Sequence, residues 1–184
     1  MSEAHAIVEP VAVPTFDDVY AAHVDAVYRY ASNRVPAASV DDVVQETFLV
    51  VHRRLASFAG RSSVRTWVIG IVRNVARDHL RALARRPSTA LDEDQQAGTD
   101  PSPADLIDRK HAVAVLDEAL ARMTDDQKEA FLLVEVEQLT SREAAEVLET
   151  NDNTVRTRLR AARALFAAAV TRFRARQRWG ADHG

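Results

Sequence analysis

The chain has 184 residues, of which 47% are hydrophobic and 28% charged, a composition typical of a folded protein rather than a disordered or fibrous one. It contains no cysteine, which excludes disulfide scaffolds, thiolate zinc sites and cysteine nucleophiles. The formal net charge of −3 is unevenly divided, because residues 61–86 carry seven arginines against one aspartate and residues 153–184 carry eight against one. Two arginine-rich stretches on an otherwise acidic chain predict two surfaces for a polyanion such as a nucleic acid.

Glycines and histidines argue against nucleotide and metal sites. The five glycines are too scattered for a phosphate-cradling loop, and the six histidines show no metal-ligand spacing. No serine lies in the turn sequence of a hydrolase nucleophile. We therefore expect no cofactor, no metal, no small-molecule substrate and no enzymatic activity. The acidic, proline-interrupted start and the lack of a long apolar run predict a cytoplasmic protein without a signal peptide or membrane span.

Composition divides the chain into five parts. An N-terminal tail (1–14) precedes a first domain (15–86), and a second domain (106–176) precedes a C-terminal tail (177–184). Between the domains, residues 87–105 combine prolines and acids with few large apolar side chains, which predicts a flexible acidic linker. No segment alternates with period two, so the sequence predicts an all-α fold of two small helical domains.

Three amphipathic helices are predicted in the first domain. One follows Thr15, whose cap is supported by Asp18, and a second begins at Ser39, with Asp42 three residues on. The third runs from about residue 63 to 84. Its arginines recur every four residues and predict an exposed basic ridge: Arg73, Arg77, Arg81 and Arg85.

The second domain has the pattern of a helix-turn-helix. Thr124 with Gln127 and Thr140 with Glu143 predict two helix starts, and a long arginine-rich helix follows Asp152. A short helix and a tight turn precede it. This order is typical of a helix-turn-helix, in which the second helix enters the major groove of DNA. The side chains expected to contact base edges or phosphates are Asn153, Thr154, Arg156, Thr157, Arg160 and Arg163.

From Phe16 to about Phe166 the chain resembles the extracytoplasmic-function (ECF) sigma factors of bacterial RNA polymerase. The resemblance rests on Asp41–Phe48, on Phe58–Ser63 with the helix after it, and on Gln138–Leu148 followed by Asn153–Leu159. It implies a region 2 domain that binds core polymerase and melts the minus-ten element, and a region 4 domain that reads the minus-thirty-five element. It also implies an anti-sigma partner that can hold the protein at the inner membrane.

The resemblance implies a role for individual residues. Polymerase binding falls on Asp41, Asp42, Gln45, Glu46 and Phe48. Capture of minus-ten bases falls on Arg61, Ser62, Ser63, Arg73, Asn74, Arg77 and Asp78. Two acidic side chains in the first turn of a helix are also explained by the helix dipole, so for Asp41 and Asp42 both interpretations stay open.

Some features depart from the family pattern. Glu149 and Asn153 replace glycines common around the turn, and Ala161 replaces an arginine common in the minus-thirty-five-reading helix. The arginines of residues 172–184 suit either phosphate contacts or a frayed helix end. The alternative function is a stand-alone helix-turn-helix regulator, which leaves the acidic helix around Asp42 unexplained.

Overall fold

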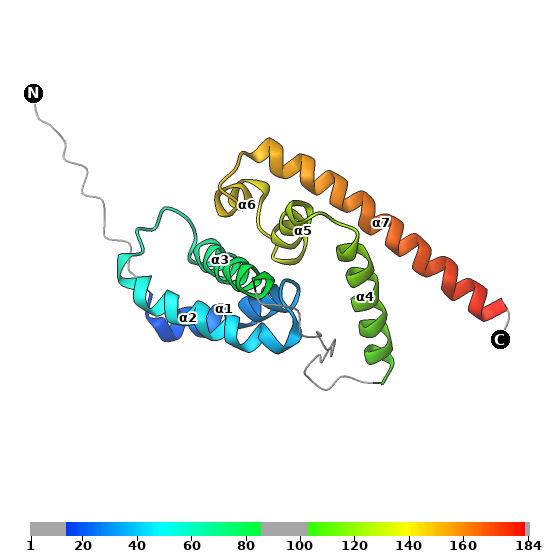
Figure 1. The fold of residues 1–184 in the computed structure, drawn as a ribbon, viewed down its shortest axis with the longest axis horizontal. Helices are drawn as coiled ribbons and strands as arrows, with labels where there is room; N and C mark the ends of the chain where they lie inside the picture. Colours follow the sequence, from blue (N-terminus) through cyan, green and yellow to red (C-terminus); the bar gives the residue numbers. More distant parts are fainter. Residues whose placement is uncertain (1–13, 86–102, 183–184) are drawn as a thin grey trace, which may run out of the picture. The chain divides into compact units, whose positions relative to one another are not determined.

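The computed structural model describes residues 14–85 and 103–182 (Figure 1). These residues form helices without any strand, so the prediction of an all-α fold is confirmed for the described part of the chain. The chain divides into two compact units at about residue 90. The predicted N-terminal tail and residues 87–102 of the predicted linker lie outside the described residues, apart from Pro14.

The first unit is a bundle of three helices, α1 (Phe16–Ser32), α2 (Val40–Arg54) and α3 (Val64–Ala84), each packed against the other two. Short 3-10 turns, Ala37–Ser39 and Leu55–Ser57, flank α2. The core consists of aliphatic side chains from all three helices around Tyr30: Val19, Val27, Val43, Val51, Val68, Ile69 and Val72. Because these residues recur every three or four positions, each helix has one apolar face, and the three faces meet in the core of the bundle.

All three helices of this unit start where the sequence predicts, and two of the starts have a side-chain cap. The Oγ1 of Thr15 accepts a hydrogen bond from the Asp18 amide at 3.2 Å, and the Oγ of Ser63 accepts one from the Thr66 amide at 3.0 Å. Helix α2 begins directly after Ser39, as predicted, although the Ser39 side chain makes no capping hydrogen bond. The chain enters α2 from a 3-10 turn, which already directs the backbone into the helix.

The second unit contains α4 (Pro103–Ala121), α5 (Asp125–Phe131), a π-helical turn (Leu132–Val136), α6 (Ser141–Val147) and α7 (Asp152–Asp182). Helix α7 packs against α4, α5 and α6. Both predicted capping boxes are present, Thr124 with Gln127 and Thr140 with Glu143. The buried side chains that join α7 to the other helices include Leu133, Leu139, Ala144, Val155, Leu159 and Ala162.

The ends of this unit differ from the sequence prediction. Helix α4 begins at Pro103, inside the segment predicted as linker, and α7 continues to Asp182, through most of the segment predicted as a tail. Glu118 of α4 holds α7 there: its Oε1 accepts a hydrogen bond from Arg172 at 2.7 Å and its Oε2 one from Arg176 at 2.5 Å. A frayed end at these arginines is therefore excluded, since both are fixed to α4.

Candidate nucleic-acid and protein interfaces

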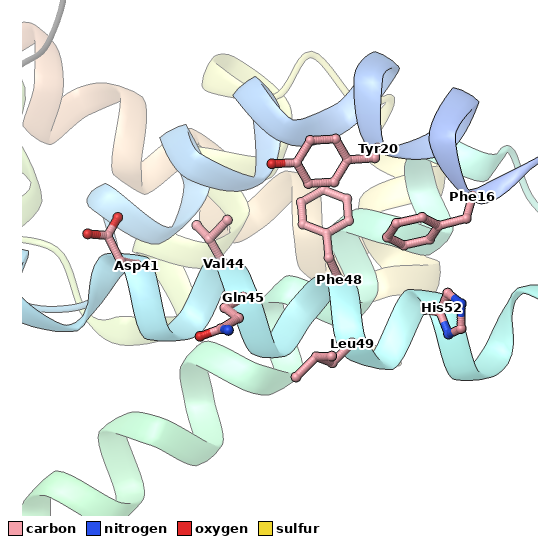
Figure 2. Close-up of a pocket in the computed structure, with 8 residues that line it drawn as sticks. All are labelled: Phe16, Tyr20, Asp41, Val44, Gln45, Phe48, Leu49 and His52. Atoms are coloured by element: carbon pink, nitrogen blue, oxygen red, sulfur yellow. The ribbon is translucent and has the colours of Figure 1, made fainter.

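A groove lined mostly by apolar side chains lies between α1 and α2 (Figure 2). Figure 2 shows Phe16 and Tyr20 reaching from α1 toward the ring of Phe48 on α2. The ring centroids of Tyr20 and Phe48 lie 4.6 Å apart, and those of Phe16 and His52 lie 5.1 Å apart. Tyr20 and Leu49 nevertheless remain 44% and 50% exposed, so a partner could still cover a large apolar area.

Three of the five predicted polymerase-binding residues line this groove. Asp41, Gln45 and Phe48 are lining residues, whereas Asp42 and Glu46 are exposed on the same helix. Phe48 is only 5% exposed, so it builds the floor of the groove rather than a projecting contact. Sequence reasoning missed Leu49 and His52, although a leucine outside the apolar stripe of α2 was a usable signal for an apolar contact surface.

Internal partners orient two of the acidic side chains. The Tyr28 hydroxyl donates a hydrogen bond to Asp41 Oδ1 at 3.2 Å, and the Asp41 charge raises the pKa of Tyr28 above its usual value. Arg53 pairs with Glu46 at 3.0 Å. The first pair joins α1 to α2 and the second joins residues two turns apart on α2, so both carboxylates have a partner within the first unit.

The loop before α3 and the start of that helix hold the predicted minus-ten residues Arg61, Ser62 and Ser63. Arg61 is exposed, and Gly60 before it has a φ of 64°, which favours glycine. The Ser62 hydroxyl donates to the Ser63 carbonyl at 3.4 Å. The Ser63 Oγ caps α3 and also lies 2.7 Å from the Thr66 hydroxyl. Its hydrogen bonds are therefore used at the helix start.

The predicted basic ridge on α3 is wrong at its first member. Arg73 is 8% exposed and donates to Asn74 Oδ1 at 3.4 Å, so its guanidinium belongs to the interior of the bundle. Arg77 is half-buried, with its Nε buried and lacking a hydrogen-bond partner in the described structure. Asp78 pairs with Arg81 at 3.7 Å. The helix rotation that buries Val72 and Ala76 also carries Arg73 inward.

In the second unit, α6, the turn and the start of α7 form the predicted helix-turn-helix (Figure 1). Ala144 and Ala145 are buried where α7 crosses α6, which allows the two backbones to approach closely. The turn contains Glu149 with a φ of 52°, a left-handed conformation that glycine adopts without strain. Asn151 then accepts a hydrogen bond from the Thr154 amide at 2.8 Å and caps α7, a role that the sequence analysis did not assign.

The predicted DNA-reading side chains fall into two groups. Asn153, Arg156, Thr157 and Arg160 are exposed on the first turns of α7, and Thr154 is half-buried. The Thr157 hydroxyl donates to the Asn153 carbonyl at 2.9 Å. Arg160 has no acidic group within 4.0 Å among the described residues, so its guanidinium is available to a ligand.

Two other arginines of α7 pair with carboxylates of neighbouring elements. Arg163 pairs with Glu135 of the π-helical turn, with its Nε and Nη2 at 2.9 and 2.6 Å from the same carboxylate oxygen. Arg158 pairs with Asp126 of α5 at 2.5 Å. Arg163 was predicted as a DNA contact, but one carboxylate accepts two of its donors and fixes it against the π-helical turn. The same pair borders a second groove, between α4, the π-helical turn and α7.

Within residues 14–85 and 103–182, no group of three or more histidines and carboxylates could hold a metal ion. In the same ranges, no helix is long and apolar enough to span a membrane. The arrangement thus offers an apolar groove with an acidic border on one unit and an exposed arginine face on the other.

Comparison with protein families gives two matches. Residues 19–86 match the family described as Sigma-70 region 2, and residues 114–166 match Sigma-70, region 4. These segments contain the groove-forming helix α2 and the helix-turn-helix, respectively.

Relatives and solved structures agree with these matches. The chain is 36% identical to the ECF RNA polymerase sigma factor SigC of Mycobacterium tuberculosis over 150 residues, covering 78% of this chain and 77% of SigC. It is 32% identical to the ECF RNA polymerase sigma-E factor of Escherichia coli over 141 residues, covering 72% and 74%. The structure of CnrH in complex with the cytosolic domain of CnrY matches with a TM-score of 0.61 at 26% identity, over 85% of this chain and 87% of CnrH. The chain therefore belongs to the ECF sigma factors, which bind core RNA polymerase and promoter DNA and direct transcription initiation.

Proposed function

We propose that this sigma factor divides its work between the two units, with polymerase binding and minus-ten capture in residues 15–86 and minus-thirty-five recognition in residues 103–182. The main support is that the two exposed surfaces differ in chemistry. The α1–α2 groove is apolar with carboxylates at its border, whereas the start of α7 presents Arg156 and Arg160. Phosphate repels the first surface and attracts the second.

The groove between α1 and α2 is the proposed docking surface for core polymerase. Tyr20 and Leu49 would supply apolar contact area, and Asp41, Asp42 and Gln45 would supply polar contacts around it. Because Tyr28 already orients Asp41, little side-chain freedom would be lost when a cationic partner group binds. This surface uses an acidic α2 that a stand-alone DNA-binding regulator does not need.

Minus-ten capture is assigned to the loop with Arg61 and Ser62 and to Asn74 on α3. Arg61 is exposed, and Asn74 is half-buried beside Arg73, so the two differ in access to DNA. Unpairing a base costs a few kcal/mol, and stacking or pocket contacts return roughly 1–3 kcal/mol per base. The free energy gained from these contacts then roughly equals the cost of unpairing. Stable capture of bases therefore depends on both units and on polymerase.

Minus-thirty-five recognition is assigned to the exposed face at the start of α7. Arg156, Thr157 and Arg160 follow one another at helical spacing, and a buried interface with α6 holds the helix. An arginine can donate two hydrogen bonds to guanine in the major groove, and a threonine can contact several bases. We assign Arg163 a supporting role, because its pairing with Glu135 fixes the π-helical turn against α7.

An anti-sigma protein is a further proposed partner. CnrH is described in complex with the cytosolic domain of CnrY, and it shares this fold at 26% identity. The exposed groove of the first unit is a surface that an inhibitor of polymerase binding would have to cover. The chain itself would carry out no bond chemistry, because binding energy is enough to open a promoter.

The proposed function is tested by adding the purified chain to bacterial core polymerase and a library of promoter fragments. Co-elution on size exclusion, followed by sequence-selective initiation, is the expected result. Binding to duplex DNA without binding to core polymerase would contradict the assignment of the α1–α2 groove. Loss of initiation by the Arg160→Ala variant with unchanged core binding would support the division of work.

A further inference from the structure

The start of α7 contains an acidic side chain in a place where the helix is expected to meet phosphates. Asp152 is the first residue of α7, and its Oδ2 lies 2.7 Å from Arg156 Nη2, one helical turn away. The Asp152 side chain is 36% exposed and that of Arg156 is 65% exposed. The second carboxylate oxygen, Oδ1, is buried and has no hydrogen-bond partner in the described part of the chain.

A surface ion pair of this spacing adds only about 0.3–0.5 kcal/mol to a helix. A carboxylate on a DNA-facing helix also repels phosphate, so as a stabilising device alone Asp152 would work against binding. Asn151 already caps α7 through the Thr154 amide, so the helix start does not depend on Asp152 for this hydrogen bond. The helix dipole favours a carboxylate in this first turn, and beside this general effect Asp152 makes one specific contact, with Arg156.

The guanidinium of Arg156 has five N–H donors in a planar fork. The Asp152 carboxylate engages Nη2 and restricts the rotation of a long, otherwise mobile side chain. Donors remain free for a second, bidentate acceptor, and guanine presents O6 and N7 in the major groove at the matching spacing. We propose that Asp152 is a specificity-determining residue, which holds Arg156 so that its free donors read one guanine of the minus-thirty-five element.

This inference rests on the proposed function of α7. It predicts that loss of the Asp152 charge changes DNA affinity and base preference in opposite directions. Asp152→Asn removes one negative charge near the phosphates, so the protein should bind unrelated duplexes roughly twofold more tightly. This factor corresponds to the Coulomb repulsion between one charge and a phosphate about 10 Å away in water. At the same time, preference for guanine at one position should weaken, because Arg156 then samples other acceptors. Affinity and specificity should move in opposite directions.

The probe is a duplex library with randomised minus-thirty-five positions, bound by the full chain assembled with core polymerase. The unaltered protein should select guanine at one position, and Arg156→Ala should remove that preference. Asp152→Asn should lower it by roughly threefold or more, a part of the discrimination that a bidentate arginine provides. In the Arg156→Ala background, Asp152→Asn should leave the selected sequence unchanged.

Glu149→Gln is the matched control, because Glu149 is an exposed acid in the adjacent turn, and none of the ion pairs in the described part of the chain involves it. It should raise binding to unrelated duplexes without changing the selected sequence. Thermal unfolding checks that each variant folds.

The inference is overturned if Asp152→Asn keeps the guanine preference that Arg156→Ala removes, or if it weakens all duplexes equally. If Arg156→Ala changes no position at all, the assignment of Arg156 to promoter reading fails as well, so the two failures are distinguishable.

Discussion

The groove of the first unit and the long helix of the second unit are held in place by different forces. Around the groove, the rings of Phe16, Tyr20 and Phe48 pack in edge-to-face and tilted contacts next to an aliphatic core. Along α7, ion pairs to α4, α5 and the π-helical turn supplement buried apolar side chains. An exposed aromatic surface suits a protein partner. On α7, some arginines form ion pairs with other elements of the fold, and the remaining ones can contact DNA.

The largest effect is expected from removing the exposed apolar side chains of the groove. Tyr20→Ala combined with Leu49→Ala should weaken core polymerase binding by at least about 2 kcal/mol, because aromatic and aliphatic anchors carry much of the energy of an interface. Titration of labelled protein with core polymerase measures the change. Val113→Ala in the second unit, which removes a side chain that is 44% exposed, is the control and should leave binding unchanged. Equal weakening by both changes would contradict the groove assignment.

Arg160→Ala should have the next largest effect, on DNA alone. Loss of one base or phosphate contact should weaken binding to a minus-thirty-five duplex by about 1–3 kcal/mol, without weakening core binding. Fluorescence anisotropy with the selected duplex gives the affinity. Asn74→Ala is its counterpart in the first unit and should spare duplex binding while lowering the yield of open complexes. If Asn74→Ala reduced duplex binding as much as Arg160→Ala, the two units would not divide the work as proposed.

The ion pairs along α7 make the second unit sensitive to acid. Hydrogen bonds from Arg172 and Arg176 lower the pKa of Glu118 from its ordinary 4.5 to about 2. A lowered pKa in the folded state stabilises the fold above the ordinary pKa, and this contribution is lost as the pH falls from about 4.5 through about 2. Unfolding of residues 103–182 should thus become easier over this range. The Glu118→Gln variant should show a smaller acid dependence by circular dichroism, and an unchanged pH profile would contradict the role of this carboxylate.

A small stabilisation is expected at the turn before α7. Glu149 has a φ of 52°, so Glu149→Gly should relieve backbone strain and raise the free energy of unfolding by up to about 1 kcal/mol. Glu146→Gly, inside α6, should lower it by about 0.5–1 kcal/mol, because glycine costs a helix conformational entropy. Denaturant unfolding compares the two variants, and the same sign for both would show that strain at residue 149 is unimportant.

The helices and most of their starts followed from the sequence, because helix periodicity and capping depend on residues three or four apart. The capping boxes at Thr124 and Thr140 show this directly. The family could be recognised for the same reason, since its motifs are local runs on single helices. The orientation of the exposed arginine face at the start of α7 is a local property as well.

Only the tertiary structure decided which charged and aromatic side chains remain available. Arg73 turned inward and Arg163 paired with Glu135 because of helices that lie far away in the sequence. Tyr20 is an aromatic residue of α1, yet α2 covers it only in part and leaves an open groove. Spacing along the chain determines which face of a helix a residue occupies, whereas burial and pairing depend on what the rest of the fold brings to that face.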